Sequence, residues 1–165
     1  AMICGSTQTL GFTNANLRVL NIRRVLVTSE RMAKLLDFAT RYTAAWCSQD
    51  AASVAAFFSP SGSLTINGGT PSVGRSAITE AAQGFMSAFP DLMVYMDDVV
   101  EHGDKVVYKW TLEGINSGPG GTGNRVRVSG FEEWQLGGDG LVAKSLGNYD
   151  ATEYQRQVDG VTGSK

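Results

Sequence analysis

One carboxylate in this sequence occupies a position where an apolar side chain would be expected. Residues 125–136 alternate as a strand does, and one set of alternate positions holds Val126, Val128, Gly130, Glu132, Trp134 and Leu136. Successive side chains of a strand point to opposite faces, so this more apolar set is predicted to face the core. Glu132 then has to be paired, protonated or beside a cavity, because an unpaired buried charge is costly.

The chemistry that such a glutamate offers is proton transfer. A carboxyl group in an apolar pocket has a raised pKa and can serve as a general acid or base, which makes Glu132 the candidate catalytic residue. Two alternatives stay open. Glu132 could be a structural residue bonded to Tyr42 or to a backbone amide, or the alternation of the strand could be shifted by one residue.

Other polar and aromatic side chains are predicted to share this interior. The hydroxyl groups of three tyrosines could orient a substrate oxygen, although a packed core aromatic is the alternative for each. Large aromatic residues and methionines could form the inner wall of a pocket, although core packing accounts for most of them. Substrate contacts are predicted for Tyr42, Trp46, Phe85, Met96, Tyr108, Trp110, Trp134, Ser145 and Tyr149.

Several other kinds of site are excluded by composition and spacing. His102 is the only histidine and has no nitrogen or thiol at a spacing that suits a metal, so no metal site is expected. Gly118, Gly120 and Gly123 match G-x-G-x-x-G, but the segment joins two predicted strands and opens no helix, which argues against a nucleotide cofactor. The net charge of −2 gives no basic face for nucleic acid, and no apolar run could span a bilayer. A soluble cytoplasmic protein without a cofactor is predicted.

The elements that must position these residues follow from periodicity and turn signals. Residues 17–27 are compatible with an extra strand or a short amphipathic helix. Helices are predicted at 30–47, 51–58, 77–88 and 151–157, and strands at 63–67, 92–100, 105–115, 125–136 and 141–149. Helices followed by hairpin-connected strands predict an α+β fold with an antiparallel sheet. The domain is predicted at residues 29–157, with an N-terminal extension at 1–28 and a C-terminal tail at 158–165.

An ordered set of motifs resembles one known family. Gly74-Arg75-Ser76-Ala77-Ile78 is similar to the G-R-x-A-I that opens the third helix of the SnoaL-like polyketide cyclases, within the NTF2-like superfamily of cystatin-like α+β cones. Phe89-Pro90-Asp91-Leu92 with the turn Glu101-His102-Gly103-Asp104 resembles their F-P-D-L…E-x-G-D block, and Trp110-Thr111-Leu112-Glu113-Gly114 their W-T-x-x-G strand. Ser129-Gly130, Asp139-Gly140 and Tyr149-Asp150 resemble their final hairpin.

The resemblance implies a curved antiparallel sheet wrapped over three helices, an apolar pocket and a homodimer. It also implies acid–base chemistry without a metal or redox cofactor. The sequence departs from the family pattern at Gly147, where an acidic residue is usual three positions before the aspartate that matches Asp150. Ser145 stands where the cyclase pattern often has histidine.

Three hypotheses of function follow. The first is an enzyme of cyclase, isomerase or hydrolase type acting on a bulky apolar carbonyl or epoxide compound. The second is a non-catalytic protein that binds an apolar ligand, which the glycine at position 147 favours. The third is a dimeric interaction module whose pocket is filled by side chains.

Overall fold

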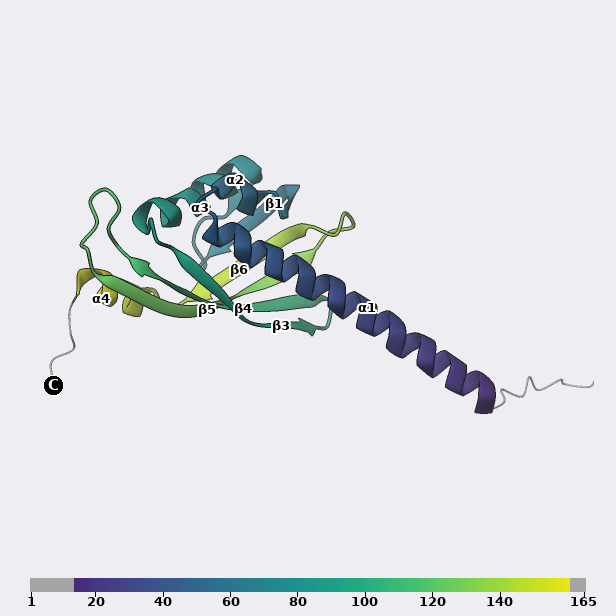
Figure 1. Ribbon diagram of the computed structural model, residues 1–165. Coiled ribbons are helices and arrows are strands. Elements are labelled where there is room, and N and C mark those ends of the chain that lie inside the picture. The colour runs from purple at the N-terminus through teal and green to yellow at the C-terminus, as the bar shows by residue number, and fades with distance from the viewer. Residues whose placement is uncertain (1–13, 161–165) are drawn as a thin grey trace, which may run out of the picture. The chain divides into compact units, whose positions relative to one another are not determined.

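The computed structural model describes residues 14–160. The chain divides into two compact units, Ala1–Leu35 and Leu36–Lys165. The helices are α1 (Asn14–Cys47), α2 (Ala51–Ala55), α3 (Arg75–Ala88) and α4 (Ala151–Asp159). The strands are β1 (Phe58–Ile66), β2 (Ser72–Val73), β3 (Met93–His102), β4 (Lys105–Ile115), β5 (Arg125–Leu136) and β6 (Val142–Tyr149) (Figure 1). None of the helices between residues 14 and 160 combines the length and hydropathy that a membrane span needs.

The described part of the first unit is helical. Residues 17–27, predicted as an extra strand or a short helix, belong to α1, which begins at Asn14 rather than at residue 30. The strand alternative fails because Val19-Leu20 and Arg23-Arg24 interrupt an alternating pattern, whereas leucine and arginine are good helix formers. The proposed limits of the N-terminal extension, the domain and the tail stay predictions.

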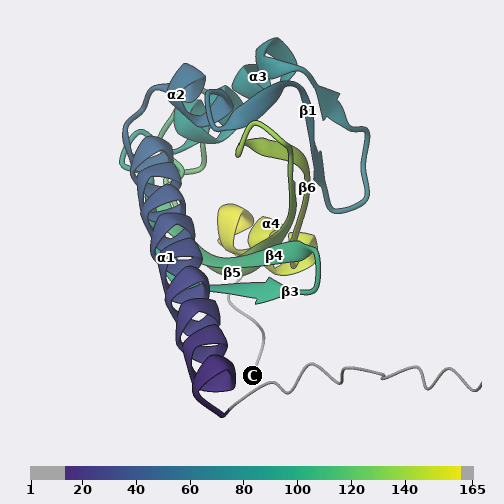
Figure 2. The same ribbon diagram turned by 90° about the vertical axis from the view of Figure 1, so that its right-hand side faces the viewer.

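The second unit is built on one curved sheet of six strands. Their order is β2-β1-β6-β5-β4-β3, in which β3 to β6 form an antiparallel meander and β1 pairs with β6 in parallel. Figure 2 shows the curvature, with β3, β4 and β5 as one side of the sheet and β6 and β1 turning up from them. This is the α+β fold predicted from the order of helices and strands.

The start of β1 is where the sequence prediction and the structure differ most within the sheet. The helix predicted at 51–58 ends at Ala55, and β1 begins at Phe58, which is fully buried opposite Val142. Pro60 and Gly62 were expected to separate two elements. They lie inside β1 instead, where the pairing with β6 shifts register between Phe58 and Ser63 and so tolerates a residue without a backbone N–H.

The alternation predicted for the central strands is confirmed. On β5, Val126, Val128, Glu132 and Trp134 are buried, while Leu136 is exposed. On β6, alternation predicts that Leu141, Ala143, Ser145, Gly147 and Tyr149 face inward. Ser145 and Gly147 are buried, but at the start of the strand Val142 is buried in place of Leu141 and Ala143. The error begins where the pairing of β5 with β6 shifts register between Gln135 and Leu136, because such an irregularity reverses the face of every residue beyond it.

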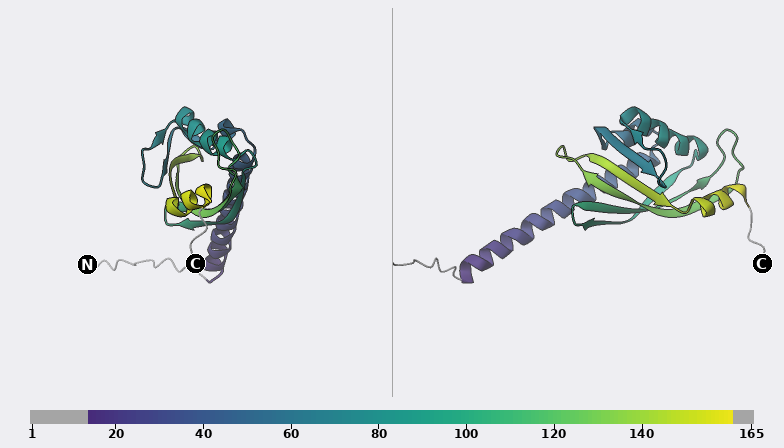
Figure 3. Two further views of the ribbon diagram at one scale, coloured as in Figure 1. Left: turned by 90° about the vertical axis from the view of Figure 1, so that its left-hand side faces the viewer. Right: turned by 180° about the vertical axis from the view of Figure 1, so that it is seen from behind.

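The helices cover the concave side and one end of the sheet. Ile78, Ala82 and Met86 form the buried stripe of α3, at the spacing that an amphipathic helix requires. Asp150 caps the start of α4, because its side chain accepts a hydrogen bond from the backbone N–H of Glu153. The helix α4 follows β6 and packs beside β5 (Figure 3). The concave face between α1, α3 and the sheet therefore holds the core.

Candidate functional site

Glu132 lies in the core and accepts hydrogen bonds from three neutral side chains. The hydroxyl of Tyr42 lies 3.0 Å from both Oε1 and Oε2. Nε1 of Trp134 donates to Oε2 at 2.7 Å, and the hydroxyl of Ser145 donates to the same oxygen at 2.9 Å. The bond to Tyr42 matches the structural alternative raised from the sequence. The donations from Trp134 and Ser145 were not predicted.

None of these three donors carries a charge, so they orient the carboxyl group without neutralising its negative charge. Burial raises the pKa of Glu132 above its ordinary value, and the hydrogen bonds from Trp134, Ser145 and Tyr42 offset part of that rise. Burial, followed by the nearby carboxylate, raises the pKa of the Tyr42 hydroxyl well above its usual range, so Tyr42 stays a donor. Glu132 is thus oriented in an apolar setting that favours its protonated form.

An aromatic cluster fixes these donors in place. The ring of Trp134 stacks on Tyr108 with centroids 4.8 Å apart, and Tyr42 meets Trp134 edge-on at 5.1 Å. The Tyr108 hydroxyl shares a 2.5 Å hydrogen bond with the hydroxyl of Thr43, and burial raises the Tyr108 pKa. The hydroxyls of Tyr42 and Tyr108 are therefore both engaged within the protein rather than free to bind a substrate oxygen.

A cavity opens beside Glu132. Its lining residues come from two helices and five strands and are mainly apolar or aromatic: Trp46, Leu64, Ile66, Phe85, Val94, Tyr108, Trp110, Leu112, Glu132, Gly147 and Tyr149. The space open to the centre of a water-sized sphere is about 50 Å³. That is enough for roughly four water molecules, or for one ring of a ligand whose remainder extends to the mouth.

The structure brings together most, but not all, of the residues predicted to contact a substrate. Trp46, Phe85, Tyr108, Trp110 and Tyr149 line the cavity. Tyr42, Trp134 and Ser145 instead lie behind Glu132 as its hydrogen-bond donors, and Met96 is half-buried outside the lining set. The sequence prediction of substrate contacts omitted Leu64, Ile66, Val94, Leu112 and Gly147. Their alternation with polar neighbours in the strands was the available signal.

The sheet register arranges the cavity wall as two rows. One row runs across the strands from Tyr108 through Glu132 to Gly147. The next row, two residues along each strand, runs from Trp110 through Gly130 to Tyr149. Diagonal neighbours in adjacent rows of a sheet are about 7–8 Å apart, so Trp110 lies within reach of a ligand that contacts Glu132.

Two glycines shape these rows differently. A Cβ at Gly130 would lie 2.6 Å from Cζ2 of Trp110 and 2.5 Å from the carbonyl oxygen of Asn148, so the absent side chain leaves room for the indole. A Cβ at Gly147 would meet Cγ of Glu132 at an ordinary 3.7 Å. The space beside Gly147 thus belongs to the cavity, whereas the space above Gly130 is already filled by Trp110.

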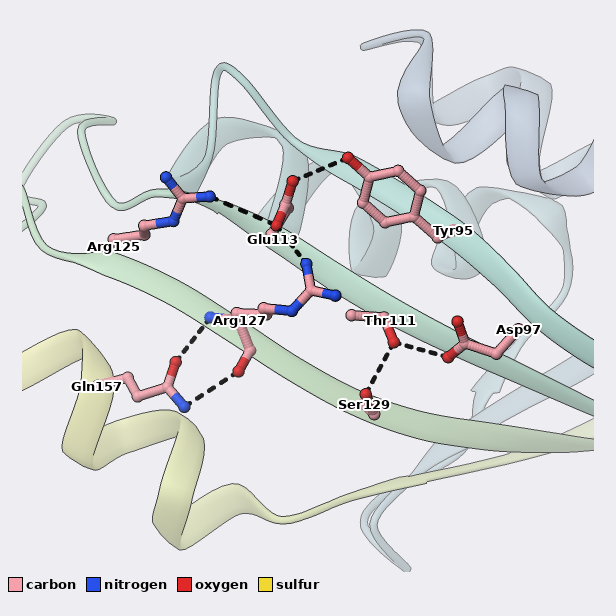
Figure 4. Close-up of polar contacts among 8 residues, drawn as sticks. All are labelled: Tyr95, Asp97, Thr111, Glu113, Arg125, Arg127, Ser129 and Gln157. Carbon is pink, nitrogen blue, oxygen red and sulfur yellow. Dashed lines mark hydrogen bonds and ion pairs between the residues drawn. The ribbon is translucent and has the colours of Figure 1, made fainter.

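The opposite face of the sheet is polar and is drawn in Figure 4. Glu113 accepts a hydrogen bond from the Tyr95 hydroxyl at 2.8 Å and from Arg127 at 2.5 Å, and Arg125 lies 3.5 Å away. The hydroxyl of Thr111 donates to Asp97 and lies 2.8 Å from that of Ser129. These bonds satisfy side chains that face away from the cavity. Within residues 14–160, no three His, Cys, Asp or Glu side chains come together as a metal site.

The comparison with known families assigns the class of this protein. The profile of the SnoaL-like polyketide cyclase family matches residues 36–158, and the chain belongs to that family. The match covers the second unit up to α4. Among curated proteins, none matches this chain.

Solved structures share the NTF2-like fold. AclR of Streptomyces galilaeus superposes with a TM-score of 0.68 at 21% identity, covering 81% of this chain and 86% of AclR. TsrD of Streptomyces laurentii gives 0.67 at 24% identity, covering 78% and 97%. A ketosteroid isomerase-like protein of Catenulispora acidiphila, crystallised with trimethylamine, gives 0.65 at 16% identity, covering 74% and 92%. At these low sequence identities, the superpositions show the shared fold alone.

Proposed function

We propose that this protein is a cofactor-independent acid–base enzyme that acts on an apolar carbonyl or epoxide compound, with Glu132 as the catalytic residue. The observation that supports this proposal is a buried carboxyl group with a raised pKa in the wall of an otherwise apolar cavity. A carboxylate made more basic by burial removes a proton from carbon or oxygen more readily than a solvated one.

The hydrogen bonds of Glu132 identify the oxygen that carries the proton. Oε2 accepts from Trp134, Ser145 and Tyr42, whereas Oε1 accepts only from Tyr42, which it shares with Oε2. A carboxylate oxygen has two lone pairs, so Oε1 keeps acceptor capacity. For a carbonyl substrate, Oε1 takes a proton from the carbon next to the carbonyl, and the electron pair moves onto the carbonyl oxygen to form an enolate.

The enolate then reacts further inside the cavity. It takes a proton back from Glu132 at another carbon, which gives an isomer. Alternatively its carbon attacks a second carbonyl to close a ring, and the oxygen of that carbonyl takes the proton back from Glu132. The apolar walls exclude water from the enolate and from the protonated carboxyl. Family membership supports this class of reaction, since the family is that of the polyketide cyclases.

A non-catalytic binding protein is the second candidate function. Gly147 supports it, because this glycine stands where the family pattern has an acidic residue, and Glu132 is the one carboxyl group among the residues that line the cavity. The interaction module with a filled pocket has less support, since a cavity lies on the concave face. The homodimer implied by the family resemblance stays a prediction, which sedimentation equilibrium of the full chain would test.

The experiment compares wild type with Glu132→Gln and Glu133→Gln. A panel of aromatic polyketides, steroids and terpene epoxides is screened by thermal shift, because a ligand that binds the native state raises its melting temperature. Compounds that bind are then assayed for turnover. Glu133 is the matched control, since it is the next residue of β5 but bonds Lys105 on the other face at 2.7 Å.

The glutamine variant is expected to fold. Its amide oxygen can take the place of Oε2 and accept from Trp134 and Ser145, while its amide nitrogen donates to the Tyr42 hydroxyl. The proposal requires turnover that Glu132→Gln reduces by at least about a hundredfold and Glu133→Gln leaves intact. Binding without turnover in all three proteins would establish the second candidate function instead.

A further inference from the structure

One polar atom near the cavity has no partner within the protein. Among residues 14–160, Nε1 of Trp110 is the one buried side-chain nitrogen or oxygen without a hydrogen bond. Trp110 lines the cavity, and its ring meets that of Tyr149 edge-on with centroids 6.0 Å apart. Leaving a buried donor unmet costs free energy, so a molecule that supplies an acceptor recovers that energy on binding.

The other two tryptophans show that the fold can satisfy an indole where it needs to. Trp134 donates its N–H to Glu132 at 2.7 Å, and the Trp46 side chain hydrogen-bonds Tyr42, which offsets part of the rise in the Tyr42 pKa. Trp110 has no such group within reach. Its Cζ2, two bonds from Nε1, lies over Gly130, which carries no side-chain acceptor.

Trp110 and Glu132 lie close enough in the sheet for one ligand to contact both residues. Gly130 pairs with Trp110 across the sheet, and Glu132 lies two residues further along the same strand on the same face. The indole N–H and the carboxyl group therefore stand in adjacent rows of one wall. A ligand in the cavity can contact both, with an oxygen at one row and an acidic hydrogen at the other.

We propose that Trp110 donates its indole N–H to a carbonyl oxygen of the ligand and so selects flat apolar compounds that carry a ketone over hydrocarbons of the same shape. This inference rests on the proposed function, because it requires a ligand in the cavity. It also assigns the enolate oxygen formed by Glu132 to Trp110 rather than to Tyr42 or Tyr108, whose hydroxyls are engaged by Glu132 and Thr43. A site built around an unmet donor discriminates strongly against analogues that lack the acceptor.

The test uses 1-tetralone and tetralin, two bicyclic probes of nearly equal shape that differ in one carbonyl. Dissociation constants of both are measured for wild type, Trp110→Phe and Trp46→Phe by NMR titration. The preference of wild type for the ketone is expected to fall about three- to tenfold in Trp110→Phe, which keeps an aromatic ring but loses the N–H. Trp46→Phe, which alters another cavity tryptophan, should weaken the binding of both probes to the same extent.

A measurement on wild type alone covers the case in which Trp110→Phe does not fold. The indole N–H resonance of Trp110, assigned through its contacts with the Tyr149 ring, should move downfield with 1-tetralone and stay in place with tetralin. An unmoved resonance together with an unchanged ketone preference in Trp110→Phe would overturn the inference and leave the ligand-binding cavity standing. Failure of both probes to bind wild type would overturn the inference, whereas the proposed function is decided by the turnover assay of Glu132→Gln.

Discussion

Glu113 and Glu132 lie on adjacent strands, and each accepts hydrogen bonds from several side chains, yet their environments move their pKa values in opposite directions. Glu113, on the outer face, is bonded by Tyr95 and by Arg127, and these bonds lower its pKa. Glu132, on the inner face, is bonded only by neutral donors, and burial raises its pKa. The difference shows that burial, rather than the number of hydrogen bonds, decides which carboxylate holds its proton more tightly.

The largest effect is expected from removing the inner carboxylate. Glu132→Ala leaves the buried donors of Tyr42, Trp134 and Ser145 without an acceptor. The free energy of unfolding should fall by about 2–4 kcal/mol, since each unmet buried donor costs about 1–3 kcal/mol and the loss of a buried charge offsets part of the sum. Urea denaturation measures the change, and a variant as stable as wild type would show that these donors find water instead.

Alanine substitutions at the two inner-face glycines, Gly130 and Gly147, should affect stability to different extents. Gly130→Ala forces its methyl group against Trp110 and the Asn148 carbonyl and should lower the free energy of unfolding by about 1–3 kcal/mol. Gly147→Ala meets only ordinary contacts and should change stability by under about 1 kcal/mol, yet its methyl group enters the cavity beside Glu132. Denaturation and 1-tetralone titration of both variants would separate the two roles, and equal stability losses would contradict this assignment.

Opposite pKa shifts predict opposite dependences of stability on pH. The folded protein binds the proton of Glu132 more tightly than the unfolded chain, so this contribution is complete below the unfolded pKa of about 4.3 and is lost as pH rises through the folded pKa. For Glu113 the folded pKa is lower, so its contribution is present above about pH 4.3 and is lost as pH falls.

Glutamine variants isolate these two contributions. The free energy of unfolding of wild type minus that of Glu132→Gln should fall as pH rises from about 4 to about 8. The same difference for Glu113→Gln should stay level above about pH 5 and decline as pH falls below about 4.3. Denaturation at each pH measures both. Parallel slopes for the two variants would mean that the two faces do not differ in the way the structure indicates.

The smallest effect is expected on the outer face at neutral pH. Glu113→Ala removes ion pairs with Arg125 and Arg127, whose side chains are largely exposed and well solvated. Such pairs contribute little to stability, so the denaturation midpoint should fall less than in Glu132→Ala or Gly130→Ala. The affinity for 1-tetralone should be unchanged as well, and a loss of binding would show that the polar face is coupled to the cavity.

The sequence allowed the inner face of the sheet to be predicted because alternation is a local signal. It placed Glu132, Tyr108 and Trp110 on one face, and the structure has them there. It could not identify Trp134 and Ser145 as donors to Glu132, since that depends on rotamers and on the register between β5 and β6. It also missed the unmet N–H of Trp110, because a lack of partners is a property of the whole packed interior.

Features that depend on pairing between segments far apart in the sequence could not be predicted from the sequence either. The parallel pairing of β1 with β6 leaves no trace in either strand, and the register shift near Leu136 reversed the predicted face of the first residues of β6. For residues 17–27, a helix and a strand were both compatible with the sequence. A short apolar stretch with interspersed arginines does not show clearly whether its apolar residues recur with the period of a helix or of a strand.

The place of β1 between β2 and β6 has a consequence for how the protein is made. Strands β3 to β6 pair with their neighbours in sequence, but β1 has to wait for β6, which is the last strand to leave the ribosome. Until then Leu64 and Ile66 lack the partners that bury them, and the cavity wall is incomplete. Contacts between distant segments form slowly, so the apolar side chains of β1 stay exposed in the nascent chain at least until β6 has been made.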